Sequence, residues 1–494
     1  MVLAQRAEEI TADAAGLEKQ IAELMGESTS DNQSAAPVLR DEEKKATLFD
    51  LAMIWSGANI IVGTWAVGAL ATAVFGLDLM GAVWALVVGN ILGGAALGIT
   101  STLGKVGAPQ MLLSRYSMGI KGAKIPSFFN FLSNIGWFAA NTVLVTLATF
   151  QVFELLHVRP GTIAKLIVLA IIVVLQIYLG LTNFDLMKKV EAWLVIPMAI
   201  LVVYMTFKAF SGVDWGGGLP PKSFAAGSSF NYWTMWISAV GAIGLGYLGA
   251  WAPYAADFTR FFNFKKKGAD QGVFWVGLLV GGIVAMWLEL IGAAFATVQG
   301  GADPALHIAK AVPGFAIPAL IIVLGGLVST NILNLINGGL SAKAVWKTGT
   351  RVQWTWIIGI VGSIMAVYSV FVSDVASMYH TFLIALLIWE APWLALLLVD
   401  YFYIRKQDYR IADLYQLNRV IPDYDRAGVT AYATGFIAAM LFSFTGKHDL
   451  FGVIPLYSPL MLKYFNGGDI SYFVGFIVTG VVYLAMARPQ GKRS

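Results

Sequence analysis

Residues 55–68 are WSGANIIVGTWAVG, and residues 240–257 are VGAIGLGYLGAWAPYAAD. Each stretch lies inside an apolar run long enough to cross a bilayer as a helix, for which about 20 residues suffice. They occupy the first and the sixth such runs, and glycine or proline interrupts both. Interruptions at corresponding places predict two inverted repeats, each with a broken helix that exposes backbone groups near the bilayer midplane. The alternative is close helix packing, which also favours glycine.

The composition predicts an all-α polytopic membrane protein. The chain has 494 residues, of which 58% are hydrophobic and 13% charged, and its mean hydropathy is +0.71. A soluble domain carries about 25% charged residues. The chain has no cysteine and only four histidines, so disulfides and thiol catalysis are excluded and a histidine-rich metal site is not expected. The sequence contains no nucleotide-binding or hydrolase motif, so we expect neither an enzyme nor a bound cofactor.

We expect twelve transmembrane spans, with both termini on the same side. Of the 33 Lys and Arg residues, 26 then lie on the side of the termini and 7 on the other. The positive-inside rule makes the first side cytoplasmic. We expect the bilayer to be the cytoplasmic membrane. The predicted spans are 49–75, 80–104, 127–153, 163–182, 190–211, 231–256, 272–298, 314–341, 353–372, 378–404, 428–446 and 470–487.

These spans divide the chain into a core with flanking segments. We expect a cytoplasmic tail over 1–46 that has helical periodicity and is exposed to solvent. A role in binding a partner is the alternative. The transporter core would cover 47–404, with the inverted repeats at 49–211 and 231–404. A cytoplasmic loop (405–427), two additional spans (428–487) and a short tail (488–494) would follow.

Span 8 carries five polar residues in nine positions: Ser329, Thr330, Asn331, Asn334 and Asn337. Thr330, Asn334 and Asn337 share a helix stripe, and Ser329 and Asn331 flank it on opposite edges. Hydroxyl oxygens suit a small hard cation, and amides suit a planar neutral ligand because each offers donors and an acceptor. Hydrogen bonding between helices is the alternative use.

Aromatic residues beside amides predict a stacking site. Trp137 and Asn141 in span 3 are four residues apart, as are Tyr247 and Trp251 in span 6, so each pair shares a face. A flat heteroaromatic ligand stacked between such rings gains about 1–3 kcal/mol per base.

Ionisable groups inside spans are rare and therefore informative. Glu289 in span 7 and Glu390 in span 10 are candidates for a proton path or a structural pair. Asp257 and Arg260 lie at the cytoplasmic end of span 6, and Arg115 lies in a cytoplasmic loop. Ion pairing or gating is the expected role of these last three.

Five motifs in this order resemble the nucleobase–cation symporter-1 family, and more narrowly its purine–cytosine permeases. The resemblance extends over about residues 45–487. The motifs are GAPQMLLSRYSMGIKG (107–122), SNIGWFAAN (133–141), YLGAWAPYAADFTRF (247–261), STNILNLINGGLS (329–341) and EAPWLALLLVDYF (390–402). The resemblance implies a LeuT-like five-plus-five inverted repeat with broken helices 1 and 6, two additional C-terminal helices, and cation-driven uptake of nucleobases or related ureides.

The resemblance also implies roles for single residues. Trp137 and Trp251 match the stacking rings, Asn141 the polar partner in span 3, and Asn331 and Asn334 the pair that hydrogen-bonds the base. The hydroxyls of Ser329 and Thr330 match a sodium site, completed by backbone carbonyls near Asn59, Val62 and Gly326. The family's polar contact in span 1 has no clear equivalent here, and Gly63 and Thr64 are the nearest candidates.

We therefore expect a monomeric symporter that imports cytosine or a purine with Na⁺ or H⁺, in contact with lipid and without nucleic acid. The alternatives are the same fold with allantoin, hydantoin, uracil, thiamine or pyridoxine as substrate, and a proton drive through Glu289. A channel or a transceptor is the alternative from another class.

Overall fold

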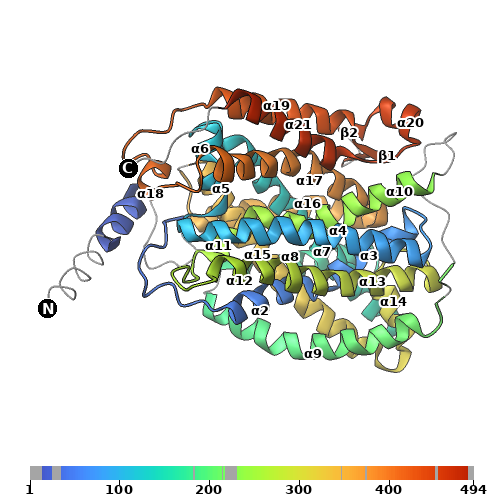
Figure 1. Ribbon diagram of the computed structural model, residues 1–494. Coiled ribbons are helices and arrows are strands. Elements are labelled where there is room, and N and C mark those ends of the chain that lie inside the picture. Colours follow the sequence, from blue (N-terminus) through green and yellow to red (C-terminus); the bar gives the residue numbers. More distant parts are fainter. Residues whose placement is uncertain are drawn as a thin grey trace.

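Long apolar helices run side by side through the molecule (Figure 1). The structure is a computed structural model that describes residues 14–24, 35–181, 184–213, 215–216, 231–346, 348–372, 375–450 and 454–487. Within these residues, eight helical segments are long and apolar enough to cross a membrane, and a bent pair of helices makes a ninth. This arrangement is that of a multi-pass membrane protein.

The first half of the chain supplies the helices that include the bent pair. A helix over 14–24 precedes them. The main elements are α2 (Leu48–Asn59), α3 (Val62–Ala73), α4 (Leu79–Thr102), η1 (Leu103–Val106), α5 (Gln110–Leu113), α6 (Arg115–Met118), α7 (Lys124–Leu155), α8 (Thr162–Leu181) and α9 (Phe184–Phe210).

The second half begins with a span of mixed helix type. Its elements are α10 (Tyr232–Ala239), η2 (Val240–Leu248), η3 (Gly249–Tyr254), α11 (Ala255–Thr259), α12 (Ala269–Trp275), η4 (Val276–Gly281), α13 (Gly282–Gln299), α14 (Pro304–Ala311), η5 (Pro313–Phe315), α15 (Ala316–Val345), α16 (Arg351–Val372), α17 (Val375–Leu398), η6 (Val399–Ile404), α18 (Ile411–Leu414), α19 (Arg426–Leu441), α20 (Pro459–Phe465) and α21 (Ser471–Met486).

Each predicted span coincides with helical structure, but the eleventh ends early and the chain is not purely helical. The helix α19 stops at Leu441, and an antiparallel hairpin of β1 (Phe444–Leu450) and β2 (Ile454–Tyr457) follows. The N–H of Phe444 donates to Asp469 (2.6 Å), and Asp469 also accepts from the N–H of Ser471 (3.1 Å). The hairpin is thereby fastened to the start of α21.

The first span is bent by 58° between α2 and α3. A capping box of Thr47 and Asp50 begins α2, and Ile61 is extended (φ −135°, ψ 155°) where α3 begins. The hydroxyl of Thr64 donates to the carbonyl of Asn59 across the break (2.7 Å). The interruption thus falls inside the glycine-bearing stretch quoted above, and side chains satisfy part of the freed backbone.

The sixth span is not broken as predicted. It continues from Tyr232 to Thr259 and changes from α-helix to π-helix over η2, then to 3₁₀-helix over η3. A Cβ at Gly244 would lie 2.1 Å from the backbone of Gly89 in α4, so this glycine serves close packing. Pro253 lies within η3 and has no N–H to donate to the helix. Packing, the alternative explanation, therefore accounts for Gly244.

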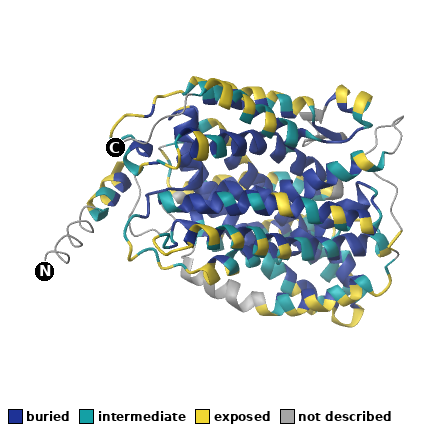
Figure 2. Ribbon diagram, in the orientation of Figure 1, coloured by how far each residue is buried: buried dark blue, intermediate teal, exposed yellow. Residues whose placement is uncertain are grey.

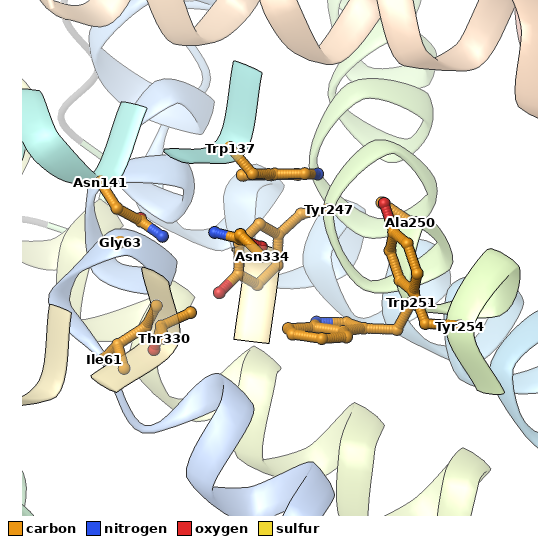
Figure 3. Close-up of a pocket in the computed structure, with 10 residues that line it drawn as sticks. All are labelled: Ile61, Gly63, Trp137, Asn141, Tyr247, Ala250, Trp251, Tyr254, Thr330 and Asn334. Carbon is orange, nitrogen blue, oxygen red and sulfur yellow. The ribbon is translucent and has the colours of Figure 1, made fainter. Parts of the chain in front are cut away.

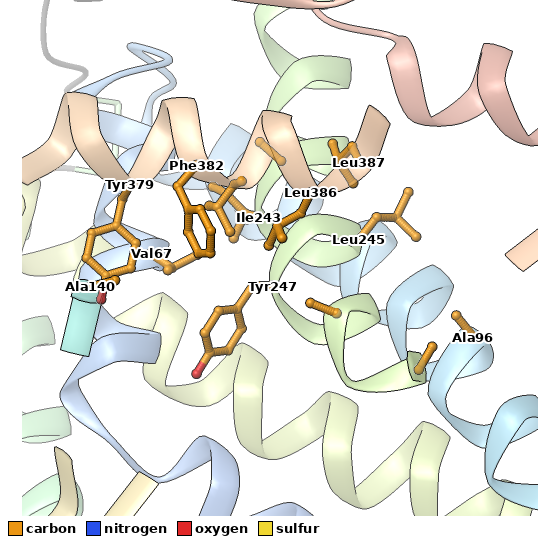
Figure 4. Close-up of a cluster of buried hydrophobic side chains, with 14 of the residues drawn as sticks. Val67, Ala96, Ala140, Ile243, Leu245, Tyr247, Tyr379, Phe382, Leu386 and Leu387 are labelled. Atoms are coloured by element: carbon orange, nitrogen blue, oxygen red, sulfur yellow. The ribbon is translucent and has the colours of Figure 1, made fainter. Parts of the chain in front are cut away.

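Buried residues fill the middle of the bundle (Figure 2). Tyr247 on η2 lies within a cluster that includes Tyr379 and Phe382 of α17, so the sixth span packs against the tenth (Figure 4). Large apolar side chains on α8 point outward, among them Ile163, which is 76% exposed. Such a face suits contact with lipid.

Residues 35–46 lie against one end of the bundle, on the side of α18 and α11 (Figure 1). The carbonyl of Ala35 accepts from the hydroxyl of Tyr415 (2.7 Å), and that of Ala36 accepts from Arg260 Nη1 (2.9 Å). The N–H of Val38 donates to the carbonyl of Gly107 (2.8 Å). The expectation of a solvated tail is therefore wrong for residues 35–38, which are buried because neighbouring elements supply their hydrogen bonds, whereas Asp41, Glu42 and Lys45 are exposed.

Candidate functional site

A pocket lies between the break of span 1 and spans 3, 6 and 8 (Figure 3). The space between its lining side chains is about 400 Å³, including its open side. Six predicted site residues line it: Gly63, Trp137, Asn141, Trp251, Thr330 and Asn334. Four further residues complete the lining: Ile61, Tyr247, Ala250 and Tyr254.

The two tryptophans lie on opposite sides of the pocket in the close-up (Figure 3). The ring of Trp137 packs edge-on against Tyr247, with centroids 5.7 Å apart and an interplanar angle of 77°. The ring of Trp251 packs edge-on against Tyr254, 6.1 Å between centroids, and against Trp55, also 6.1 Å. Edge-on support holds each indole in place and leaves a ring face for a ligand.

The asparagines form a network in which Asn331 lies behind the other two. Asn331 is fully buried and is not among the lining residues. Its Oδ1 accepts from Asn141 Nδ2 (3.2 Å) and from Asn334 Nδ2 (3.1 Å). The structure thus separates the predicted asparagine pair, since Asn334 faces the pocket and Asn331 holds it from behind.

Two residues that the sequence analysis missed complete this network. The Nδ2 of Asn331 donates to Thr142 Oγ1 (3.1 Å), to the carbonyl of Phe138 (3.2 Å) and, in a short contact, to Gln176 Oε1. Gln176 lies on α8, a largely apolar helix, and a lone buried amide there was the available signal. Asn337 is buried outside the pocket, and neither of its amide atoms has a partner among the described residues.

Span 1 meets the pocket through its second helix. A Cβ at Gly63 would lie 3.4 Å from Asn141 Oδ1, so glycine lets this backbone approach the amide. Thr64 does not line the pocket, but its hydroxyl makes a short hydrogen bond to the hydroxyl of Tyr247. Tyr254 and Ile61 were missed because their roles depend on the bend and on the 3₁₀ turn.

Only some of the predicted cation ligands lie close to one another. Thr330 Oγ1 donates to the carbonyl of Gly326 (3.1 Å), and a Cβ at Gly326 would lie 3.9 Å from the Ile61 side chain. The carbonyl of Asn59 accepts from Thr64 Oγ1 (2.7 Å) and keeps a second lone pair. Ser329 and Val62 are buried outside the pocket lining. Within the described part of the chain, no cluster of three His, Asp or Glu side chains could hold a metal ion.

The acidic candidates lie outside the pocket. Glu289 on α13 is fully buried, and its Oε2 accepts from Asn90 Nδ2 (2.5 Å), while Oε1 has no partner among the described residues. Glu390 on α17 is equally buried, and a Cβ at Gly249 would lie 4.0 Å from its Oε1. Glu289 and Glu390 therefore do not pair through any described contact.

The end of span 6 is held by α5 and by residues 35–46. The N–H of Gln110 donates to Asp257 Oδ1 (2.8 Å), and Gln110 Oε1 accepts from the N–H of Ala256 (3.0 Å). Arg260 Nε donates to the carbonyl of Asp257 (3.3 Å). The two residues predicted to gate thus lie together in a buried cluster of hydrogen bonds at this end.

Comparisons with known proteins agree with this architecture. The profile of a family described as permease for cytosine/purines, uracil, thiamine, allantoin matches residues 37–475. The putative purine-cytosine permease YxlA of Bacillus subtilis is 26% identical over 471 residues, which is 92% of this chain and 95% of that protein. The hydantoin permease of Microbacterium maritypicum is 24% identical over 450 residues, 87% of each chain.

A solved structure shares the fold. It is that of Mhp1, a nucleobase-cation-symport-1 family transporter, in a closed conformation with bromovinylhydantoin bound. It superposes with a TM-score of 0.68 at 17% identity, covering 91% of this chain and 94% of that one. With the family profile spanning most of the sequence, the chain belongs to the nucleobase–cation symporter-1 family, in its purine–cytosine permease branch.

Proposed function

We propose that this chain is a secondary active symporter that imports cytosine or a purine across the cytoplasmic membrane together with a cation, by alternating access. It would act as a monomer of twelve spans, with two inverted five-helix repeats and both termini in the cytoplasm. Family membership and the purine–cytosine permease relatives support the substrate class.

The observation that carries the proposal is the lining of one pocket by two indoles and two amides. A planar base would stack between Trp137 and Trp251, and Asn141 and Asn334 would hydrogen-bond its edge. Stacking contributes about 1–3 kcal/mol per base, and hydrogen bonds in a water-poor site add selectivity. The Asn331 side chain would act on the base only through these two amides.

For the coupling ion we propose sodium between spans 1 and 8. Ser329 and Thr330 would supply hydroxyl oxygens, and Asn59, Val62 and Gly326 would supply backbone carbonyls. The approach of Gly326 to Ile61 at the break supports this position. Binding there would steady the bend between α2 and α3, which borders the base pocket through Gly63.

A proton is the second candidate, because Glu289 is a buried carboxyl with one oxygen unpartnered among the described residues. Its backbone also touches span 1, since a Cβ at Gly68 would lie 2.1 Å from the Glu289 carbonyl oxygen. Movement of span 1 would therefore alter the surroundings of this carboxyl.

The test is uptake of labelled cytosine, adenine, hypoxanthine, uracil and allantoin into proteoliposomes, with and without an inward sodium gradient. We expect cytosine or a purine to accumulate with sodium, and Thr330→Ala to abolish the sodium dependence while leaving base binding measurable. If uptake follows only a pH gradient and is lost in Glu289→Gln, the coupling ion is the proton and not sodium. Accumulation of allantoin alone would contradict the proposed substrate.

A further inference from the structure

The hydrogen bonds behind the pocket have a fixed direction. A backbone carbonyl can only accept, so the atom of Asn331 that faces the carbonyl of Phe138 is the amide nitrogen (3.2 Å). The carbonyl of Ile172 likewise fixes Gln176, whose Nε2 donates to it (3.4 Å), so that Oε1 faces Asn331. Two main-chain carbonyls therefore determine which end of each buried amide points where.

This direction is passed on to the pocket. With its nitrogen held by Phe138 and Gln176, Asn331 turns Oδ1 toward Asn141 and Asn334, and both must present Nδ2 to it. The carbonyl oxygens of Asn141 and Asn334 then accept no hydrogen bond among the described contacts and are available to a ligand, beside the second N–H of each amide. The position of Asn141 Oδ1, 3.4 Å from a Cβ built on Gly63, agrees with this, because Gly63 lines the pocket.

Two lining hydroxyls also have their protons engaged elsewhere. Thr330 donates to the carbonyl of Gly326 (3.1 Å), which leaves lone pairs on its oxygen. Thr64 donates to the carbonyl of Asn59 (2.7 Å), so the proton shared by Thr64 and Tyr247 belongs to Tyr247. The side-chain oxygens of Asn141, Asn334, Thr330 and Tyr247 thus all offer acceptors.

We propose that Gln176, acting through Asn331, is a positioning residue that turns the Asn141 and Asn334 carbonyls to the ligand, so that the pocket selects a neutral planar heterocycle by its N–H donors, exocyclic amino groups foremost. The inference rests on the proposed function and assigns the substrate edge that this site recognises. An unmatched carbonyl in such a pocket is costly, so a ligand that lacks the donor is rejected.

The first test compares matched ligands on the wild-type protein. Adenine and purine differ only by the exocyclic amino group, as do cytosine and 2-pyrimidinone. We expect the amino member of each pair to inhibit uptake at about tenfold lower concentration, the factor that corresponds to about 1.4 kcal/mol. Equal inhibition by both members would overturn the inference and leave base transport standing.

If only hydantoin or allantoin is transported, the proposed substrate is wrong. The donor preference is then tested with a ligand whose N–H groups are methylated. Hydantoin should then inhibit more strongly than 1,3-dimethylhydantoin by the same factor. Equal inhibition would refute the donor preference in this case too.

The second test concerns Gln176 itself. In Gln176→Leu, Asn331 loses its shortest acceptor and is held only by Phe138 and Thr142. The orientation of the two pocket amides is then less strongly fixed, and we expect the ratio of the inhibitory concentrations of purine and adenine to fall toward one. Gln176→Glu keeps an acceptor toward Asn331 and should retain the ratio. Thr142→Val, which removes another acceptor of the Asn331 amide (3.1 Å), is the milder variant should Gln176→Leu not fold.

The matched control is Thr146→Val. Its hydroxyl lies one turn further along α7 and donates only to the carbonyl of Thr142 (2.8 Å) among the described contacts. A purely structural role for Gln176 would lower uptake of all ligands and leave their ratio unchanged. If both Gln176→Leu and Thr142→Val keep the wild-type ratio of inhibition by adenine and purine, the positioning role is rejected.

Discussion

At the scale of single residues, buried polar atoms are organised by neighbours that can hydrogen-bond in only one direction. Main-chain carbonyls orient Asn331, and the same reasoning applies to His307 on α14, outside the spanning helices. Trp65 Nε1 donates to His307 Nδ1 (3.2 Å), and His307 Nε2 donates to the carbonyl of Gly300 (3.1 Å). These two bonds require a neutral imidazole, because Nδ1 must accept.

The free energy of unfolding should therefore fall at low pH, because His307 becomes protonated more readily in the unfolded state. Burial lowers the pKa of His307 from 6.5 to about 4, and the charge of Lys310 contributes in the same direction. The folded state then binds fewer protons than the unfolded state, so stability is full above pH 6.5 and is lost as pH falls toward 4. The size is of the order of 3 kcal/mol.

Thermal unfolding in detergent at pH 7.5 and pH 5 checks this. His307→Phe, which keeps a ring beside Phe295, should lose part of the pH dependence and have lower stability at pH 7.5, because Trp65 loses its acceptor. An unchanged pH profile in this variant would show that other groups cause the acid sensitivity.

At the scale of elements, glycines determine how closely helices approach. A Cβ on Gly68 of α3 would lie 2.1 Å from the carbonyl oxygen of Glu289 on α13. Gly57 of α2, in the other half of the same span, has nothing within 4 Å of the added atom. The two positions carry the same residue for different reasons.

Gly68→Ala should destabilise the protein by about 1–3 kcal/mol or more, because backbone atoms must move apart. Gly57→Ala, the matched control, should leave stability unchanged or raise it by up to about 1 kcal/mol, since alanine favours helix. The thermal unfolding midpoints of the two variants, measured in the same detergent, test this prediction. Equal midpoints would mean that α3 and α13 can separate without cost.

At the scale of the whole molecule, residues 35–46, α5, α11 and α18 are joined at one end of the bundle. Arg260 is central, since it binds the carbonyls of Ala36 and Asp257 from a position that is 1% exposed. Under alternating access, this end must separate whenever the pocket opens toward it. The cluster is thus a candidate for the closed gate.

Arg260→Ala should favour the state that is open at this end. Of its two hydrogen bonds, the one to Ala36 joins span 6 to residues 35–46. Loss of that bond from a charged donor, about 1.5–3 kcal/mol, shifts a two-state population roughly ten- to a hundredfold. Because the chain has no cysteine, a single Ala256→Cys reports the change through its rate of maleimide labelling. Lys265→Ala, which removes an exposed ion pair with Asp41, is the control. Equal labelling rates in both variants would exclude a gating role.

The sequence by itself determined the membrane character, the helical segments and the chemical types gathered at the site. Apolar run length predicts helices because lipid leaves no other partner for the backbone. It also indicated the interruption in span 1, and the order of motifs matched the family. Of the predicted pocket residues, Trp137, Asn141, Trp251, Asn334 and Gly63 do line one space.

Only the tertiary structure decided which amide faces the pocket and which holds it. Asn331 and Asn334 are three residues apart on one helix, and their different roles depend on Gln176 and Phe138 on other helices. The continuity of span 6, with glycine packed on Gly89, and the hairpin after α19 also depend on contacts between distant segments. Local sequence carries no information on these contacts, because hydrogen-bond direction and helix separation are properties of the assembled neighbours.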